Sequence, residues 1–310
     1  MRLTPLFALS LLLSICTSAQ MPKASSGRIV RIDSFRSKFV TARNVDVWLP
    51  PGYPSAGRYD VLYMHDGQML FDSTITWNRQ EWRADETAGA LIAQKNTRPF
   101  IIVGIHNNAR LRLAEYFPEK AAQKLSPSER DSLLKEVGGQ LLADEYLQFL
   151  TKEVKPYIDS AFASNPARAH TFIAGSSMGG LISLYAVCEY PRVFGGTACL
   201  STHWPGSFRG LNDGGQLFGA LRSYLEQQLP DNRFRKKWAT PSRVYMDYGN
   251  KTLDSFYTAL QPQIDELFRK KAYRPAQFSS RYFPGADHSE RSWAARLEEP
   301  LLFLLGRATR

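Results

Sequence analysis

Cysteine is scarce in this sequence, with three residues in a chain of 310. This number excludes a disulfide-stapled scaffold, which needs several cysteine pairs. Beyond the first residues, no stretch approaches the roughly twenty consecutive apolar residues that a membrane-spanning helix requires. We therefore expect a mature chain that is soluble and has no stable membrane span.

Dense basic runs are also lacking, although the net charge is +10, from 39 Lys and Arg against 29 Asp and Glu. The densest cluster is Arg-Phe-Arg-Lys-Lys at 233–237, which is too short to indicate a nucleic-acid surface. His and Cys residues do not occur at the spacing of a metal site. We expect no nucleic-acid partner, no metal and no cofactor, while the oligomeric state stays open.

Residues 1–19 have the layout of a signal peptide. Arg2 is followed by an apolar stretch at 6–13 and by Thr-Ser-Ala at 17–19, which predicts an exported protein, periplasmic or extracellular. Cys16 offers a lipoprotein anchor as an alternative, but Ile15 stands where such a signal needs Gly, Ala or Ser. We expect a short linker over 20–27 and one domain over 28–310.

The rest of the chain alternates short apolar runs with longer helical patterns. This alternation, in a chain that is 44% hydrophobic, predicts an α/β fold with a mainly parallel central sheet and helices on both faces. Strands are expected at 45–49, 59–64, 100–105, 171–174, 196–200, 243–248 and 277–283, and helices at 83–94, 141–162, 178–189, 216–227, 255–270 and 292–305. A polar excursion at 106–139 is the one large insertion.

The sequence Gly-Ser-Ser-Met-Gly at 175–179 contains the pattern G-x-S-x-G, with Ser177 at its centre. The pattern is short enough to occur by chance, but its context is specific, because a predicted strand precedes it and a predicted helix follows it. A serine held on such a tight turn is a nucleophile elbow. The elbow also sets Ser177 at a helix N-terminus, where the helix dipole favours developing negative charge.

A serine nucleophile needs a base, and the base needs an orienting acid. His288 follows the last predicted strand, whereas His203 follows the strand directly after the elbow and leaves no room for an acid-bearing strand before it. We therefore favour His288. For the acid, Asp254 lies beyond the carboxyl end of the strand at 243–248 and is favoured over Asp247 on that strand, with Asp287 as a third possibility.

Acyl transfer also requires N–H donors for the oxyanion that forms on the substrate. The first candidate is the backbone N–H of Met178, directly after the nucleophile. The second is the backbone N–H of Gln68, in the His-Asp-Gly-Gln loop at 65–68, where Gly67 allows the chain to turn toward the site.

These segments together resemble the esterase family of α/β hydrolases, which includes esterase D-like, feruloyl, acetyl-xylan and enterochelin-type siderophore esterases and mycolyltransferases. The resemblance covers nearly all of the mature chain. It rests on residues 65–68, 76–78, 85–86, 103–105, 112–116, 175–180, 190–194 and 288–293. It implies an α/β-hydrolase fold, a serine nucleophile at Ser177 with His288 as base, and oxyanion donors at Gln68 and Met178.

The sequence thus predicts a secreted serine esterase that acts through an acyl-enzyme. The alternatives are a siderophore esterase or an acyltransferase with the same triad and, in another class, a catalytically inactive binding module. Trp77, Tyr116 and Trp204 lie in or beside the segments expected near Ser177 and are candidates for substrate binding. With the polar excursion at 106–139, they favour short or aromatic acyl esters of carbohydrates as substrates.

Overall fold

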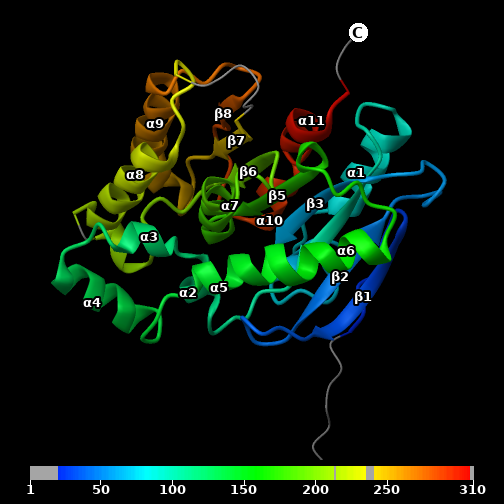
Figure 1. Cartoon of the computed structure of the whole chain (residues 1–310), viewed down its shortest axis with the longest axis horizontal. Coiled ribbons are helices and arrows are strands. Elements are labelled where there is room, and N and C mark those ends of the chain that lie inside the picture. The colour runs from blue at the N-terminus through cyan, green and yellow to red at the C-terminus, as the bar shows by residue number, and fades with distance from the viewer. Residues whose placement is uncertain (1–19, 213, 235–240, 308–310) are drawn as a thin grey trace, which may run out of the picture.

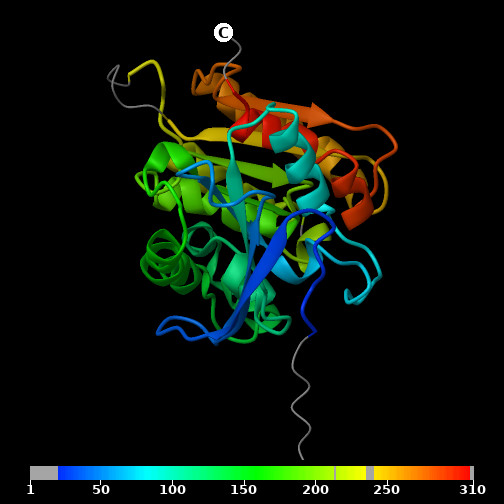
Figure 2. The same ribbon diagram turned by 90° about the vertical axis from the view of Figure 1, so that its right-hand side faces the viewer.

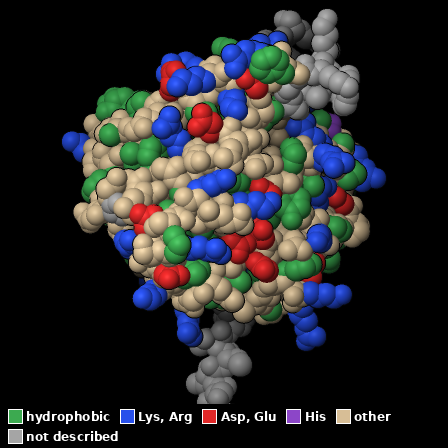
Figure 3. Space-filling view, turned by 60° about the vertical axis from the view of Figure 1, so that its left-hand side comes forward, with side chains coloured by type: hydrophobic (Ala, Val, Ile, Leu, Met, Phe, Trp, Pro, Cys, Tyr) green, Lys and Arg blue, Asp and Glu red, His purple; other side chains and the backbone are tan. Residues whose placement is uncertain are grey.

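The structure is a computed structural model that describes residues 20–307 apart from residue 213 and residues 235–240. The expected signal peptide at 1–19 and the alternative anchor at Cys16 lie outside the described residues. Within the described ranges, no helix is both long enough and apolar enough to cross a bilayer. On the face shown in Figure 3, Lys and Arg side chains are interspersed with Asp and Glu and do not form one basic patch.

An eight-stranded sheet in the order β1-β2-β4-β3-β5-β6-β7-β8 forms the centre of the molecule (Figure 1). Its strands are β1 (Arg28–Phe35), β2 (Arg43–Leu49), β3 (Asp60–His65), β4 (Phe100–Ile105), β5 (Thr171–Ser176), β6 (Gly196–Leu200), β7 (Arg243–Tyr248) and β8 (Phe278–Tyr282). The pairings β1–β2 and β2–β4 are antiparallel, and all the others are parallel. The predicted mainly parallel sheet is confirmed. Of these eight strands, β1 is the one that the sequence patterns missed. Its partly exposed side chains at the sheet edge give no clear apolar alternation.

Helices cover both faces of the sheet (Figure 2). The longer ones are α1 (Ala84–Ala93), α4 (Pro127–Glu136), α7 (Met178–Glu189), α8 (Gln216–Gln228), α9 (Asp254–Lys270) and α11 (Glu298–Leu305). The shorter ones are α2 (Arg112–Tyr116), α3 (Glu119–Ala122), α5 (Ala143–Gln148), α6 (Lys155–Ala161) and α10 (Glu290–Ala294), with single turns η1 (Gly67–Met69), η3 (Arg168–His170) and η4 (Arg209–Leu211) and the π-helical η2 (Phe149–Val154).

Two apolar cores lie on opposite faces of the sheet. Along β3, Val61 and Tyr63 belong to the core under α7, whereas Leu62 and Met64 belong to the core under α1 and α11. Successive side chains of a strand point to opposite faces, so a strand covered on both sides is apolar throughout. This explains why the central strands are continuous apolar runs in the sequence.

The predicted helix at 141–162 is continuous, since α5, the π-helical η2 and α6 follow one another without a gap. The predicted helix at 292–305 is broken between α10 and α11. Pro300 explains this break, since a proline lacks the N–H that a continuous helix would need and its ring clashes with the carbonyl four residues earlier. The break leaves α10 free to lie beside the loop that carries His288.

The parallel strands β3 and β5 to β8 all end at one edge of the sheet, and the loops that follow them carry the candidate residues. Ligand sites in open α/β sheets lie at this carboxyl edge. The excursion at 106–139 reaches the same edge, since Arg112 of α2 forms a bidentate ion pair with Asp66 directly after β3, at 2.8 and 2.7 Å. The order of the strands therefore brings together residues that are far apart in the sequence.

Candidate active site

Ser177 occupies the turn between β5 and α7 in a strained conformation, with φ 57° and ψ −124°. A non-glycine residue in such a region costs about 1–3 kcal/mol and persists only where its surroundings enforce it. Here the N–H of Ser177 donates to the Leu200 carbonyl of β6 at 2.9 Å. A Cβ added at Gly175 would lie 2.8 Å from the Gly179 backbone, so only glycine allows the strand and helix to approach this closely. The strained turn at 175–179 is the geometry expected of a nucleophile elbow.

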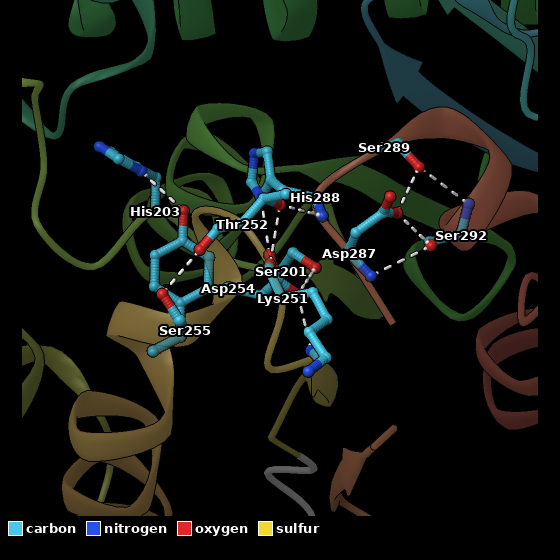
Figure 4. A network of polar contacts seen from close by, with 12 residues as sticks. Ser201, His203, Lys251, Thr252, Asp254, Ser255, Asp287, His288, Ser289 and Ser292 are labelled. Atoms are coloured by element: carbon cyan, nitrogen blue, oxygen red, sulfur yellow. Dashed lines mark hydrogen bonds and ion pairs between the residues drawn. The ribbon is translucent and has the colours of Figure 1, made fainter. Parts of the chain in front are cut away.

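His288 and Asp254 are in direct contact at the carboxyl edge (Figure 4). The distance from His288 Nδ1 to Asp254 Oδ1 is 2.7 Å, and both side chains are largely buried, with 11% and 0% exposed. The backbone N–H of His288 donates to Thr252 Oγ1 at 2.9 Å. The imidazole also packs edge-on against Trp293, with ring centroids 5.0 Å apart. These contacts hold the ring in one orientation and leave Nε2 as its remaining nitrogen.

The second oxygen of Asp254 accepts two further hydrogen bonds. Ser201 Oγ and the N–H of Gly249 both donate to Oδ2, each at 2.6 Å. Ser201 Oγ in turn accepts from Trp293 Nε1 at 3.0 Å and from Arg296 Nη2 at 2.8 Å. The sequence analysis did not identify these supporting residues. The signal that could have found Ser201 is its position directly after the predicted strand at 196–200.

The other two candidate acids have different partners. Asp247 is fully buried and pairs with Arg296, whose Nη2 lies 3.0 Å from Asp247 Oδ1. Burial raises the pKa of Asp247, although the nearby Arg296 charge opposes that rise. Asp287 accepts from Ser289 Oγ at 2.6 Å, and the hydroxyl donors around it lower its pKa. The structure therefore brings only Asp254, among these three carboxylates, against His288.

His203, the alternative base, is buried on the loop after β6. Its Nδ1 lies 2.7 Å from the Tyr257 hydroxyl and its Nε2 lies 3.2 Å from the Ser207 carbonyl oxygen. Burial lowers the pKa of His203 to about 4, so the ring is neutral at pH 7. His203 also contacts the elbow, because its N–H donates to the Ser177 carbonyl at 3.2 Å.

The loop that carries Gln68 lies against the elbow. A Cβ added at Gly179 would lie 3.4 Å from the Cβ of His65 and 3.5 Å from Asp66 Oδ2, which shows how closely the two turns approach. Gly67 has no room for a side chain, since an added Cβ would lie 2.5 Å from the Gly104 backbone. Met178 is the first residue of α7, where a backbone N–H has no carbonyl within the helix to accept it. The N–H of Gln68 stands in the single turn η1 of the neighbouring loop.

The three aromatic candidates for substrate binding differ in exposure. Trp77 is 85% exposed, and its loop is connected to the start of α10, two residues after His288, by a 2.8 Å hydrogen bond from Asn78 to Glu290. Tyr116 and Trp204 are fully buried, and the Trp204 indole donates to Gln261 at 2.7 Å. The interpretation of Tyr116 and Trp204 as substrate-facing residues is therefore corrected, because their rings fill the core and present no free face.

Phe208 is an exposed aromatic residue near the site that the sequence analysis missed. Its side chain is 70% exposed, and its ring centroid lies 6.3 Å from that of His203. Because His203 contacts the backbone of Ser177, Phe208 stands at the rim of the same edge. Nothing in the local sequence distinguishes it from other loop aromatics, since its exposure depends on the loop at 201–210.

Comparison with known proteins identifies the family. Residues 37–304 match the family described as "Putative esterase". The chain belongs to this esterase family. Its match covers the turn at 175–179, the loops with the candidate oxyanion donors and the segments that carry Asp254 and His288. Within the described residues, no group of three or more His, Cys, Asp or Glu side chains is arranged to hold a metal ion.

Solved structures show the same fold at low sequence identity. The enterobactin esterase FES from Shigella flexneri, in the presence of 2,3-di-hydroxy-N-benzoyl-glycine, is 19% identical with a TM-score of 0.63, covering 91% of this esterase-family chain and 60% of that chain. A ferulic acid esterase is 18% identical with a TM-score of 0.60, and the match covers 90% of this chain and 98% of that chain. An IroE-like serine hydrolase from Shewanella oneidensis is 20% identical with a TM-score of 0.59, and the match covers 89% of this chain and 79% of that chain. At this identity the likeness establishes an α/β-hydrolase-type fold.

One curated relative is the uncharacterized protein YbbA of Bacillus subtilis (strain 168). It is 29% identical over 164 residues, which are 52% of this esterase-family chain and 58% of the relative. The chain thus spans about three fifths of the length of YbbA and of the Shigella flexneri enterobactin esterase.

Proposed function

We propose that this chain is an exported serine esterase that hydrolyses carboxylic esters through Ser177, His288 and Asp254. The observation that carries the proposal is the 2.7 Å contact between Asp254 and His288, at the edge where a strained serine begins α7. A carboxylate on Nδ1 keeps the proton on that nitrogen and leaves Nε2 as the base. The signal-peptide pattern of the sequence at 1–19 supports export.

In the first half of the reaction, Ser177 Oγ attacks the ester carbonyl and His288 Nε2 takes its proton. Asp254 stabilises the imidazolium that forms, and its other oxygen stays fixed by Ser201 and Gly249. The backbone N–H groups of Met178 and Gln68 are the donors for the oxyanion, aided by the positive end of the α7 dipole. His288 then protonates the leaving alcohol. In the second half, water attacks the acyl-enzyme by the same route and releases the acid.

We propose short or aromatic acyl esters of carbohydrates as the substrate class. Exposed Trp77 and Phe208 lie on loops at this edge, and flat aromatic faces suit sugar rings and aromatic acyl groups. The excursion at 106–139 is rich in polar residues, which makes it a poor lining for a long acyl chain. Siderophore esters with an aromatic acyl group are the second candidate, favoured by the fold shared with the enterobactin esterase.

Labelling with a fluorophosphonate probe tests the chemistry, because such probes react with activated serines. We expect the purified mature chain to be labelled, Ser177→Ala to lose the label, and Ser176→Ala, the adjacent serine of the same turn, to keep it. A chain that is folded and not labelled would support an inactive binding module and refute the proposal. A panel of acetyl, feruloyl, longer acyl and siderophore esters then tests the substrate class. Activity that rises steadily with chain length, with no turnover of acetylated or feruloylated sugars, would refute it.

A further inference from the structure

The N-terminal segment, residues 20–27, is bound to the domain through its backbone. The N–H groups of Ser25 and Ser26 donate to Asp85 Oδ2, at 2.6 and 2.9 Å. The Ser26 carbonyl oxygen accepts from Trp48 Nε1 at 2.6 Å. Asp85 belongs to α1 and Trp48 to β2, and both side chains are fully buried. These hydrogen bonds hold the N-terminal segment between the helix and the sheet.

Two glycines allow the N-terminal segment to pack this closely. A Cβ added at Gly89 of α1 would lie 2.2 Å from Ser26 Oγ and 3.1 Å from Ser26 Cβ. At Gly27, where the segment turns into β1, φ is 72° and an added Cβ would lie 2.2 Å from the Leu49 carbonyl oxygen. A side chain at either position would therefore displace the segment from α1 or from the sheet.

The same end of α1 is bonded to the turn η1, which carries the candidate oxyanion donor. The Trp82 N–H donates to the Met69 carbonyl and the Ala84 N–H donates to the Leu70 carbonyl, both at 3.0 Å. The next residue after Ala84 is Asp85, the carboxylate that binds the N-terminal segment. One pair of backbone hydrogen bonds and one buried side chain thus connect η1 to this segment.

The N-terminal segment also contacts the loop that contains η1 directly. The Lys23 N–H donates to Asp72 Oδ2 at 2.9 Å, four residues after Gln68. Pro22 of the segment lines a cavity of about 290 Å³ together with Gly67 and Gln68. The segment therefore lies beside the oxyanion turn as well as being bonded to the residues that follow it.

We propose that Asp85 is a positioning residue: by binding the N-terminal segment it fixes the turn η1, so that the Gln68 N–H stays where the oxyanion forms. This inference rests on the proposed function, since it concerns the donor proposed there. Between β3 and α1 the chain has only one turn of helix, η1, so contacts with its neighbours determine its position. A displacement of about 1 Å at a catalytic group can cost on the order of 100-fold in rate.

The preference for an ester over its thionoester, in which sulfur replaces the carbonyl oxygen, measures binding of the oxyanion. Sulfur is a weak hydrogen-bond acceptor, so donors at the oxyanion position accelerate the ester more than the thionoester, whereas a loss of folded enzyme lowers both rates equally. We expect Asp85→Ala to lower kcat/KM for p-nitrophenyl acetate about tenfold, a part of the roughly 10²–10³-fold that the loss of one donor costs. The kcat/KM for p-nitrophenyl thionoacetate should fall less than about twofold, because its sulfur gains little from the donor.

Two variants separate the positioning role from a role in stability alone. Asp85→Asn keeps a side-chain oxygen that can accept both N–H groups and should retain the wild-type preference. Asp60→Ala is the matched control, since Asp60 is also a buried carboxylate and pairs with Arg98 at 2.8 Å, but it lies at the start of β3, at the opposite edge of the sheet. It should lower the thermal unfolding temperature and leave the preference unchanged.

Gly89→Ala displaces the N-terminal segment without altering the carboxylate, because its methyl group would meet Ser26. It should lower the preference for the ester in the same direction, and it provides the test if Asp85→Ala does not fold. A folded Asp85→Ala or Gly89→Ala variant with the wild-type preference would overturn the inference. Failure of the wild-type chain to hydrolyse either compound would instead refute the proposed function.

Discussion

Replacement of Asp254 by asparagine tests the proposed acid most directly. Asp254 Oδ2 accepts from Ser201 Oγ and from the Gly249 N–H, both at 2.6 Å. In Asp254→Asn the amide oxygen must take that position, since an NH₂ group there would face two donors. The amide NH₂ then faces His288 and donates to Nδ1. That arrangement places the imidazole proton on Nε2, where the base should be, so His288 can no longer accept the proton of Ser177.

The expected loss is about 10⁴-fold in kcat, which is the loss known for a serine hydrolase whose catalytic histidine is held in the wrong tautomer. This loss corresponds to about 5.5 kcal/mol on the barrier. Stability should change little, because the amide retains hydrogen bonds to all three partners. The assay combines ester turnover with thermal unfolding of the same preparation.

Asp247→Asn is the matched control. Asp247 is also fully buried, and it lies on β7, the strand that precedes Asp254 in the chain. It removes the negative charge that balances Arg296, and breaking a buried ion pair costs about 3–5 kcal/mol of stability. Turnover should remain within about tenfold of wild type at temperatures where the variant is folded. Equal losses of turnover in the two variants, or a larger loss in Asp247→Asn, would refute the assignment of the acid.

Three further predictions concern the nucleophile, the substrate and the pH dependence of stability. Ser177→Ala and His288→Ala should each lower kcat about a thousandfold or more without unfolding the chain, as measured by ester turnover and circular dichroism. Phe208→Ala should raise KM for feruloyl esters about fivefold, as expected for about 1 kcal/mol of aromatic contact, whereas the same change at Phe234, which is also exposed, should not. A larger effect at Phe234 would contradict a role of Phe208 in substrate binding. The pKa of His203 is about 4 in the folded chain and 6.5 ordinarily, so the unfolded state binds more protons between these values and stability falls as the pH drops through them. Thermal unfolding of His203→Asn should show a weaker loss over this range than wild type, and an equal loss would contradict the buried neutral imidazole.

The order of elements could be read from the sequence because local rules determine it. The elbow at 175–179 combines a glycine pattern with a strand before it and a helix after it, and the structure has β5, the strained Ser177 and α7 at these positions. Central strands are apolar on both faces, so they stand out as continuous runs. β1 has no such signal, because its side chains remain partly or fully exposed at the sheet edge.

Contacts between distant segments could not be read in the same way. Tyr257 fits the apolar stripe of the predicted helix at 255–270, and only the path of the loop after β7 brings it against His203 and His288. Trp204 and Tyr116 belong to segments that reach the carboxyl edge of the sheet, as expected. Whether their rings face solvent or the core depends on packing across the molecule. Exposure of Phe208 and burial of Trp204, four residues away on the same loop, illustrate that limit.

The sequence favours Asp254 over Asp247 but does not exclude Asp247, and in the structure both carboxylates contact one serine. Ser201 Oγ donates to Asp254, and the Ser201 N–H faces Asp247 Oδ1 at 3.3 Å. Arg296 decides their roles: its Nη2 is 3.0 Å from Asp247 but 4.0 Å from Asp254. A buried guanidinium needs a counter-charge, and Asp247, the closer of the two carboxylates, supplies it. Asp254 pairs instead with His288 through Oδ1, at 2.7 Å, so the two buried carboxylates have different cationic partners.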